Sequence, residues 1–195
     1  MNEQERPQRP GWYVVQVTGG SEERMCRKIE RACVELDATN TDGARVGLKE
    51  CFSPRYASRK KRMGRWYDVE RPLMPGYVVA DVLDPAMLAR ALGSLNAYCR
   101  VLTSGKAYCP LDDAERQWIQ GQTSAGNRTV PLSLGYKEGE KLVITDGPLK
   151  GREALITKID RKNSLAHLEL HAGQMTIKAK VGLVILPGGK TLQVG

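Results

Sequence analysis

The feature that most constrains the fold is a change in the pattern of residues at positions 121–133, whose sequence is GQTSAGNRTVPLS. These residues are small and polar and have no hydrophobic periodicity, so they are expected to form a linker. Before them, helical and strand patterns alternate. After them come only short β-rich runs separated by Gly, Asp and Asn. The sequence therefore predicts an N-terminal domain over residues 11–120 and a C-terminal domain over residues 134–195.

The N-terminal domain is predicted to be an α+β fold, with an antiparallel sheet and flanking helices. Its first segment, GWYVVQV at residues 11–17, is aromatic and β-branched, which is typical of a strand. Apolar residues then recur at helical spacing as far as Leu36, with Ser21 as the predicted N-cap. Asp84 and Pro85 predict the start of a second helix. KECFSPRY and RWYDVE are predicted strands, and the basic stretch ASRKKRMGR is predicted to connect them.

The C-terminal domain is predicted to be a small β-barrel. Its runs EKLVIT, REALITKI, SLAHLEL, MTIKAKV and GLVIL have the length and spacing of separate short strands. Turn residues between them, such as Asp146–Gly147–Pro148, predict hairpins.

Composition indicates a basic protein of the cell interior. Thirty Lys and Arg residues against 22 Asp and Glu give a formal charge of +8, which favours an anionic partner, usually a nucleic acid. The first ten residues are polar and rich in Pro, so they are expected to be a disordered tail and not a signal peptide. The longest apolar run, LVIL, is too short to cross a membrane. Five cysteines without a CxxC pair suit free thiols in a reducing cytoplasm.

Two groups of cations are candidates for phosphate contact. The first is a stripe on the predicted first helix: Arg24, Arg27, Lys28 and Arg31. The second is the segment from Arg55 to Arg71, with seven cations against two acidic residues, where Trp66 and Tyr67 could stack on bases. An ordinary solvated surface explains either group equally well.

Catalytic and cofactor motifs are weak. GGKT at residues 188–191 lacks the glycine that a P-loop needs at position 184, where this chain has Val184. HLELH places His167, Glu169 and His171 on one strand face, but a solvated or ligand-facing surface is favoured over a metal site. Neither histidine has a nucleophile motif near it. We therefore expect no enzyme activity, no metal and no cofactor.

Several segments resemble the NusG family of transcription factors. GEKLVITDGPLKGREALITKIDRKN resembles the KOW motif that opens the family's C-terminal domain, and GWYVVQV and RPLMPGYVV resemble its N-terminal domain. The matches run in the family's order from Gly11 to about Leu186. The residues around GPLKG are most similar to those of specialised paralogues of the LoaP antiterminator type. Two positions depart from the family pattern: Ala154 replaces a usual glycine, and Met74 replaces a usual aromatic.

The resemblance implies a fold, partners and site residues. The C-terminal part would be an SH3-like KOW barrel, and the N-terminal part would dock on the largest subunit of RNA polymerase. The implied docking residues are Trp12, Tyr13, Met74, Pro75 and Tyr77. In the same family, upstream or non-template DNA lies near the N-terminal domain. The resemblance therefore implies that Arg24, Lys28 and Arg31 contact this DNA. The protein would act in the cytoplasm as a monomer that promotes processive transcription of selected operons.

The C-terminal domain has two candidate partners. Ten Lys or Arg against six Asp or Glu from residue 134 onward favour structured leader RNA, and one aromatic residue favours shape recognition over base reading. The candidate RNA-binding residues are Lys150, Arg152, Arg161, Lys162, Lys178 and Lys180. The alternative is a protein partner, a ribosomal protein or Rho, as in a housekeeping NusG-like factor. A ribosome-associated KOW protein is a further alternative, which the N-terminal segments disfavour.

Overall fold

The computed structural model describes residues 9–186, which divide into two compact units. Unit 1 holds residues 9–54, 74–117 and 170–177, and unit 2 holds residues 55–73, 118–169 and 178–186. Eight of the ten residues of the predicted tail, and the GGKT motif at 188–191, lie outside the described residues.

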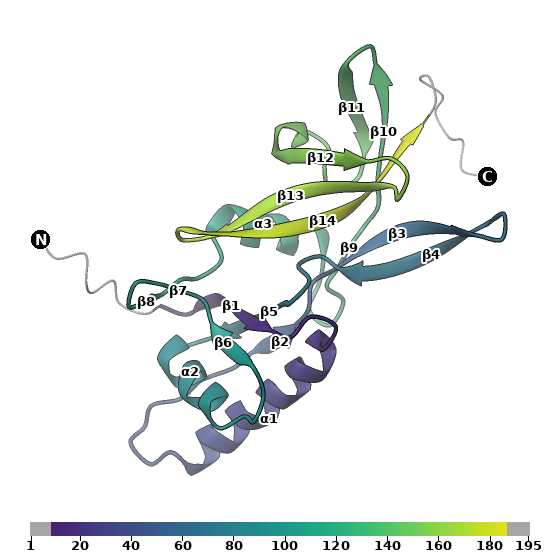
Figure 1. Ribbon diagram of the computed structural model, residues 1–195. Coiled ribbons are helices and arrows are strands. Elements are labelled where there is room, and N and C mark those ends of the chain that lie inside the picture. The colour runs from purple at the N-terminus through teal and green to yellow at the C-terminus, as the bar shows by residue number, and fades with distance from the viewer. Residues whose placement is uncertain (1–8, 187–195) are drawn as a thin grey trace, which may run out of the picture. The chain divides into compact units, whose positions relative to one another are not determined.

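Unit 1 is built on a four-stranded antiparallel sheet in the order β2-β5-β1-β6 (Figure 1). The strands are β1 (Gly11–Val17), β2 (Glu50–Phe52), β5 (Tyr77–Val82) and β6 (Cys99–Val101). The central pair, β1 and β5, aligns Val14 with Val79 and Gln16 with Tyr77. Two short strands, β7 (Thr103–Ser104) and β8 (Ala107–Tyr108), form a separate hairpin.

Helices α1 (Glu22–Thr39) and α2 (Pro85–Gly93) cover one face of this sheet (Figure 1). Alternate residues of β1, including Tyr13 and Val15, join the apolar sides of both helices in one core. Asp84 caps α2 as predicted, because its carboxylate accepts hydrogen bonds from the first-turn N–H groups. Ser21 is the N-cap residue of α1, as predicted, but its side chain does not cap the helix, because its hydroxyl donates to the Thr18 carbonyl oxygen.

Unit 2 contains a long hairpin of β3 (Arg55–Arg62) and β4 (Arg65–Pro72), with β9 (Thr129–Val130) parallel to β3. The basic stretch predicted as a connection is thus largely strand. The hairpin turns at Met63 and Gly64, whose φ angles of +49° and +79° are those of a type I′ turn. Such a turn matches the twist of paired strands, so it can hold a hairpin without apolar alternation.

The rest of unit 2 is β-rich, as predicted. A five-stranded sheet has the order β11-β10-β14-β13-β12. Its strands are β10 (Ser133–Glu138), β11 (Lys141–Asp146), β12 (Ile156–Asp160), β13 (Leu165–Ala172) and β14 (Met175–Leu186), with the short 3-10 helix η1 (Glu153–Leu155) before β12. The turn end of β13 and β14, residues 170–177, is counted with unit 1.

MTIKAKV and GLVIL form one continuous strand, β14, and not the two strands predicted from sequence. Gly182 lies inside it because β3 approaches too closely for a side chain: a Cβ at this position would overlap the Ala57 carbonyl oxygen. The Lys180 N–H also donates to the Leu73 carbonyl oxygen at 2.9 Å. The hairpin is therefore attached to β14 at its base.

The α+β fold class, with a β-rich C-terminal part, is confirmed. The domain boundaries stay a prediction. The segment predicted as linker contains β9 and begins within α3 (Asp113–Gln122), which starts in unit 1 and ends in unit 2. No helix among residues 9–186 is both long and apolar enough to span a membrane.

Candidate functional site

The Pro-Gly interruption of the apolar segment RPLMPGYVV is a tight turn that ends where β5 begins. The Tyr77 N–H donates to the Met74 carbonyl oxygen at 3.1 Å. Gly76 has a φ of +83°, and a type II turn needs such a value at its third residue, with proline favoured at the second. The proline and glycine are therefore turn residues and do not interrupt the strand itself.

Gly76 also attaches this turn to the neighbouring elements. Its N–H donates to the Glu22 carboxylate at 2.8 Å, and its carbonyl oxygen accepts from the Val17 N–H at 2.8 Å. Glu22 starts α1 and Val17 ends β1. The turn therefore fixes the start of β5 against both elements.

Of the five predicted docking residues, three are buried and two are accessible. Trp12, Tyr13 and Met74 are at most 2% exposed, whereas Pro75 is exposed and Tyr77 is half-buried. Tyr13 faces the helix-side core and donates to the Arg9 carbonyl oxygen, and its burial raises the pKa of its hydroxyl. Only Pro75 and Tyr77 present side-chain surface in this conformation.

Trp12 lies on the other face of β1 from Tyr13, because successive side chains of a strand alternate. Its ring packs edge to face against Phe52, with the ring centroids 4.9 Å apart. Gln16 and Tyr77 share this face, since they are directly paired across the strands.

A polar cluster lies beside Tyr77, and the sequence did not predict it. The Gln16 side-chain oxygen accepts from the Tyr98 hydroxyl at 3.1 Å and from Arg100 Nε at 3.0 Å. The Arg100 guanidinium also lies 6.0 Å from the centre of the Tyr98 ring, within cation–π range. These residues come from β1, β6 and the segment before β6, so no local motif joins them.

The cations of α1 form the predicted stripe. Arg24, Lys28 and Arg31 are exposed, while Met25, Ile29 and other apolar residues of the opposite face are buried. Among residues 9–186 these three cations have no ion-pair partner. Lys28 lies close enough to Cys99 for its charge to oppose the rise in the thiol's pKa that burial causes. Lys28 of the stripe therefore lies near Cys99, the first residue of the edge strand β6.

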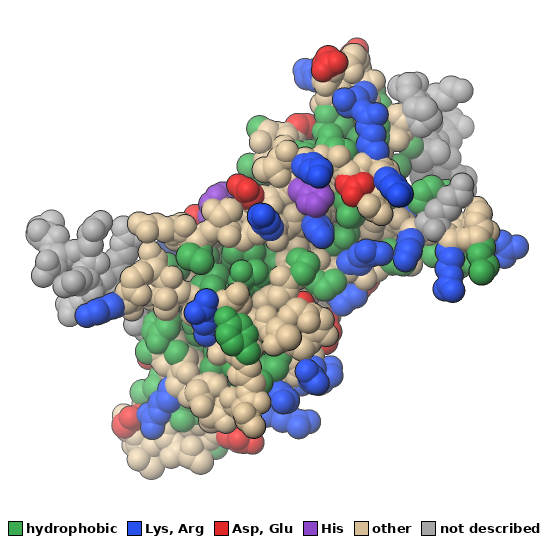
Figure 2. Space-filling model, in the orientation of Figure 1, with side chains coloured by type: hydrophobic (Ala, Val, Ile, Leu, Met, Phe, Trp, Pro, Cys, Tyr) green, Lys and Arg blue, Asp and Glu red, His purple; other side chains and the backbone are tan. Residues whose placement is uncertain are grey.

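The β3–β4 hairpin concentrates its charge at its tip. Near the base, Arg55 pairs with Glu70 at 3.3 Å, and Arg59 pairs with Asp68 at 3.1 Å. Towards the tip, Arg62 faces Arg65 across the strands without an acidic partner among the described residues. Figure 2 shows blue Lys and Arg side chains at this tip, at the right of the view.

The glycine-bounded turn of the KOW-like segment presents two of the predicted RNA-binding cations. Gly147 has a φ of +92°, and a Cβ there would lie 2.6 Å from the Leu132 carbonyl oxygen. Trp118 anchors the turn, because its indole N–H donates to the Pro148 carbonyl oxygen at 3.0 Å. Lys150 and Arg152 project from this anchored turn and are exposed.

The other four predicted RNA-binding residues lie in two places. Arg161 and Lys162 are exposed in the turn between β12 and β13. Asn163 orders this turn by donating to Asp160, and these hydrogen bonds lower the pKa of the Asp160 carboxyl. Lys178 and Lys180 share one face of β14, because the residues between and beside them are buried.

The described histidines and cysteines form no metal-binding cluster. No three His, Cys, Asp or Glu residues in the described part of the chain are placed to hold a metal ion. His171 instead lies 3.1 Å from the Glu115 carboxylate. All five cysteines are free; four are buried and Cys99 is half-buried. Burial raises the pKa of Cys33 to about 12, which suppresses the reactive thiolate.

The described residues define a two-unit α+β protein whose notable surfaces are charged or aromatic. A family model described as "Transcription termination factor nusG" matches residues 10–120, more than half of the chain. The chain belongs to the NusG family.

Two named relatives agree with this assignment. A Campylobacter jejuni protein named transcription termination/antitermination protein NusG is 28% identical over 160 residues, covering 82% of this chain and 86% of the relative. A Rickettsia felis protein of the same name is 24% identical over 156 residues, covering 78% and 77%. A structure described as "Domain interaction in Thermotoga maritima NusG" covers 89% of this chain and 94% of its own, with 19% identity and a TM-score of 0.47. The family assignment rests on the family model and not on this structure.

Proposed function

We propose that this protein is a transcription elongation and antitermination factor that acts in the cytoplasm as a monomer, without catalysis. The observation that carries the proposal is the family match over residues 10–120, together with relatives named for termination and antitermination. Within the family, we assign the chain to specialised factors of the LoaP type that promote processive transcription of selected operons.

The proposed polymerase contact lies at the start of β5. Pro75 and Tyr77 supply accessible surface at a turn that Gly76 holds rigidly, which suits docking on the largest polymerase subunit. The buried Trp12, Tyr13 and Met74 would support this surface from within the fold. Upstream or non-template DNA is assigned to Arg24, Lys28 and Arg31, because exposed cations on one rigid helix face suit phosphate contacts.

The proposed C-terminal partner is structured leader RNA. Lys150 and Arg152 project from an anchored turn, and neither has an ion-pair partner among residues 9–186. Unpaired cations on fixed turns suit the phosphates of a folded RNA better than a flat protein surface. Binding of a ribosomal protein or Rho is the competing function of this part of the chain.

The test of function is transcription in vitro across a terminator, with and without the protein. We expect more readthrough product with it. Tyr77→Ala should reduce both polymerase binding and readthrough, and Tyr67→Ala is the matched control, because Tyr67 is an exposed tyrosine of the hairpin. Unchanged readthrough with the wild-type protein would contradict the antitermination function, and greater termination when Rho is added would favour the housekeeping alternative.

The RNA contact is tested by titrating the full chain with hairpin RNA from its own operon leader at two salt concentrations. Affinity should fall steeply with salt, because each phosphate contact releases counterions. Changing Lys150, Arg152, Arg161 and Lys162 to Ala should lower both the affinity and the salt slope. An RNA affinity that changes neither with salt nor with these substitutions would favour a protein partner.

A further inference from the structure

Unit 2 contains a pocket of about 460 Å³ that combines an exposed aromatic ring with two cations. It is lined by Trp66 of β4, Lys137 of β10, Arg161 and Ser164 of the β12–β13 turn, and residues 184–186 of β14. Its volume lies within the range of about 300–1,000 Å³ that small-ligand sites occupy. All of these residues belong to one compact unit.

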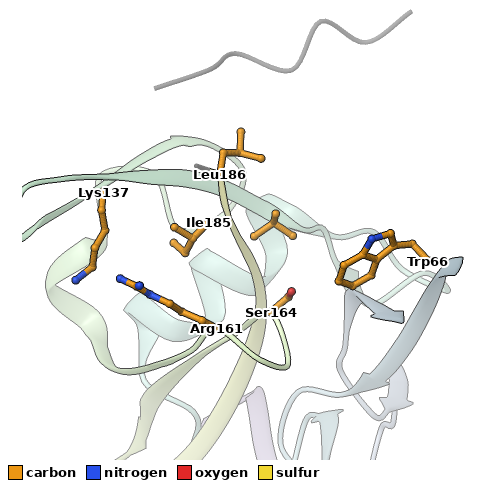
Figure 3. Close-up of a pocket in the computed structure, with 7 residues that line it drawn as sticks. Trp66, Lys137, Arg161, Ser164, Ile185 and Leu186 are labelled. Carbon is orange, nitrogen blue, oxygen red and sulfur yellow. The ribbon is translucent and has the colours of Figure 1, made fainter. Parts of the chain in front are cut away.

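The two kinds of group lie on opposite sides of the pocket. Figure 3 shows the charged ends of Lys137 and Arg161 directed towards each other on one side, with Trp66 on the other and Ser164 and Ile185 between them. Among the described residues, neither cation has an ion-pair partner. Two like charges that converge in a pocket repel each other, and a bound anion would relieve this repulsion.

Trp66 is the exposed tryptophan of the described chain. This residue is 57% exposed, whereas Trp12 and Trp118 are 2% and 5% exposed. An indole that faces solvent beside apolar strand residues offers a flat surface on which a base can stack. Its position on a twisted, exposed hairpin gives it no evident role in the core.

We propose that this pocket binds an unpaired nucleotide of single-stranded RNA, with the base on Trp66 and its phosphate between Lys137 and Arg161. This inference rests on the proposed function as an RNA-binding factor, and it adds base stacking to the shape recognition expected from sequence. An acidic peptide would satisfy the cations but would leave the indole without a partner, so the aromatic side favours a nucleotide.

The experiment uses the full chain and the octanucleotide U8, which has no secondary structure of its own. U8 should quench tryptophan emission, because the two other tryptophans are buried. Trp66→Leu should abolish the quenching and weaken binding, measured by anisotropy of labelled U8, by about tenfold. Tyr67→Leu is the matched control, since it removes the neighbouring ring from the opposite face of the hairpin and should leave affinity within about twofold.

The phosphate contacts are tested by salt dependence. Replacing Lys137 and Arg161 together with Gln should lower the slope of log affinity against log salt by about 0.7, the value for one contact to a single strand, because both cations face one phosphate. Lys158→Gln removes an exposed cation outside the pocket and should leave the slope unchanged. U8 affinity that is unaffected by Trp66→Leu, or equally tight binding of an octaglutamate peptide, would overturn the proposal.

The outcomes separate this inference from the proposed function. If leader hairpin RNA depends on Lys150 and Arg152 while U8 does not bind, the pocket proposal fails and the RNA-binding factor stands. If U8 binds through Trp66 but the protein causes no readthrough, the pocket stands and the antitermination function fails. Thermal unfolding of each variant checks that it retains the wild-type fold.

Discussion

Strand β1 and the β3–β4 hairpin differ in what keeps their strands paired. Five of the seven residues of β1 are buried, and its alternate side chains enter the core under α1 and α2. Every residue of β4 except Val69 and Pro72 is exposed. The first strand is specified by burial, whereas the hairpin depends on its turn and on a few contacts at its base.

This difference also determines which side chains each region can present to a partner. A strand that forms part of the core cannot offer its side chains to a partner, which is why Trp12 and Tyr13 present almost no surface. A hairpin whose second strand, β4, is largely exposed can carry Trp66 and unpaired cations. The predictions below test this contrast through the free energy of unfolding, measured by urea denaturation.

The largest loss of stability is expected for a substitution in α1, which packs against β1. Ile29 of α1 is fully buried in the core. Ile29→Ala should lower the free energy of unfolding by about 2–5 kcal/mol, because it loses apolar burial and leaves a cavity. Val34→Ala on the same helix is the control, since Val34 is 68% exposed and its truncation should change stability by less than about 0.5 kcal/mol. Equal losses would mean that the helix is not held by this core.

The next effect is expected where the hairpin meets β14. Gly182→Ala should cost about 1–3 kcal/mol, because the new methyl group overlaps the Ala57 carbonyl oxygen and forces the strands apart. Gly93→Ala is a matched substitution with open space around it. A tolerated Gly182→Ala would show that the hairpin base is less constrained than β1.

A smaller loss is expected at the turn before β5. Gly76→Ala meets no steric overlap, since the nearest atom is the Val17 carbonyl oxygen at 3.6 Å. Its φ of +83° should still cost about 1–2 kcal/mol, because an L side chain is strained in the left-handed region. Gly19→Ala has neither constraint, and it should behave as wild type in the same denaturation experiment.

The smallest effect is a gain at the hairpin tip. Met63 adopts a φ of +49°, a conformation that Asn tolerates better than Met does. Met63→Asn should therefore stabilise the protein by a few tenths of a kcal/mol. Met63→Ala lacks the short polar side chain with which Asn can hydrogen-bond locally in this conformation, so it should bring no gain. A loss with Asn would mean that the methionine side chain itself contributes to the hairpin.

The elements that sequence predicted well are those with a local cause. β1 and α1 follow from apolar periodicity, and the start of α2 follows from a capping carboxylate before a proline. The strand character of ASRKKR was missed because this segment has no apolar alternation: the residue that it buries, Ser58, is polar. The type I′ turn of the hairpin also lacked the usual signal, since Met63 occupies a position where Asn or Gly is expected.

The site was predictable only where its residues are close in sequence. The α1 stripe and the cations of the C-terminal turns could be named from spacing and turn residues. The pocket of Trp66 could not, because Trp66 lies about seventy or more residues before every other residue that lines the pocket. The same holds for the contacts of Gln16 with Tyr98 and Arg100, which depend on the pairing of β1 with β6.

The uneven burial of the cysteines has a practical consequence for following this protein at work. Four thiols are shielded and Cys99 alone is partly accessible, so a maleimide dye should attach at one place without any engineering. Cys99 begins the edge strand beside Lys28. A fluorophore there would sit next to the cations assigned to DNA, and its energy transfer to a labelled duplex would report each arrival and departure of the factor in real time.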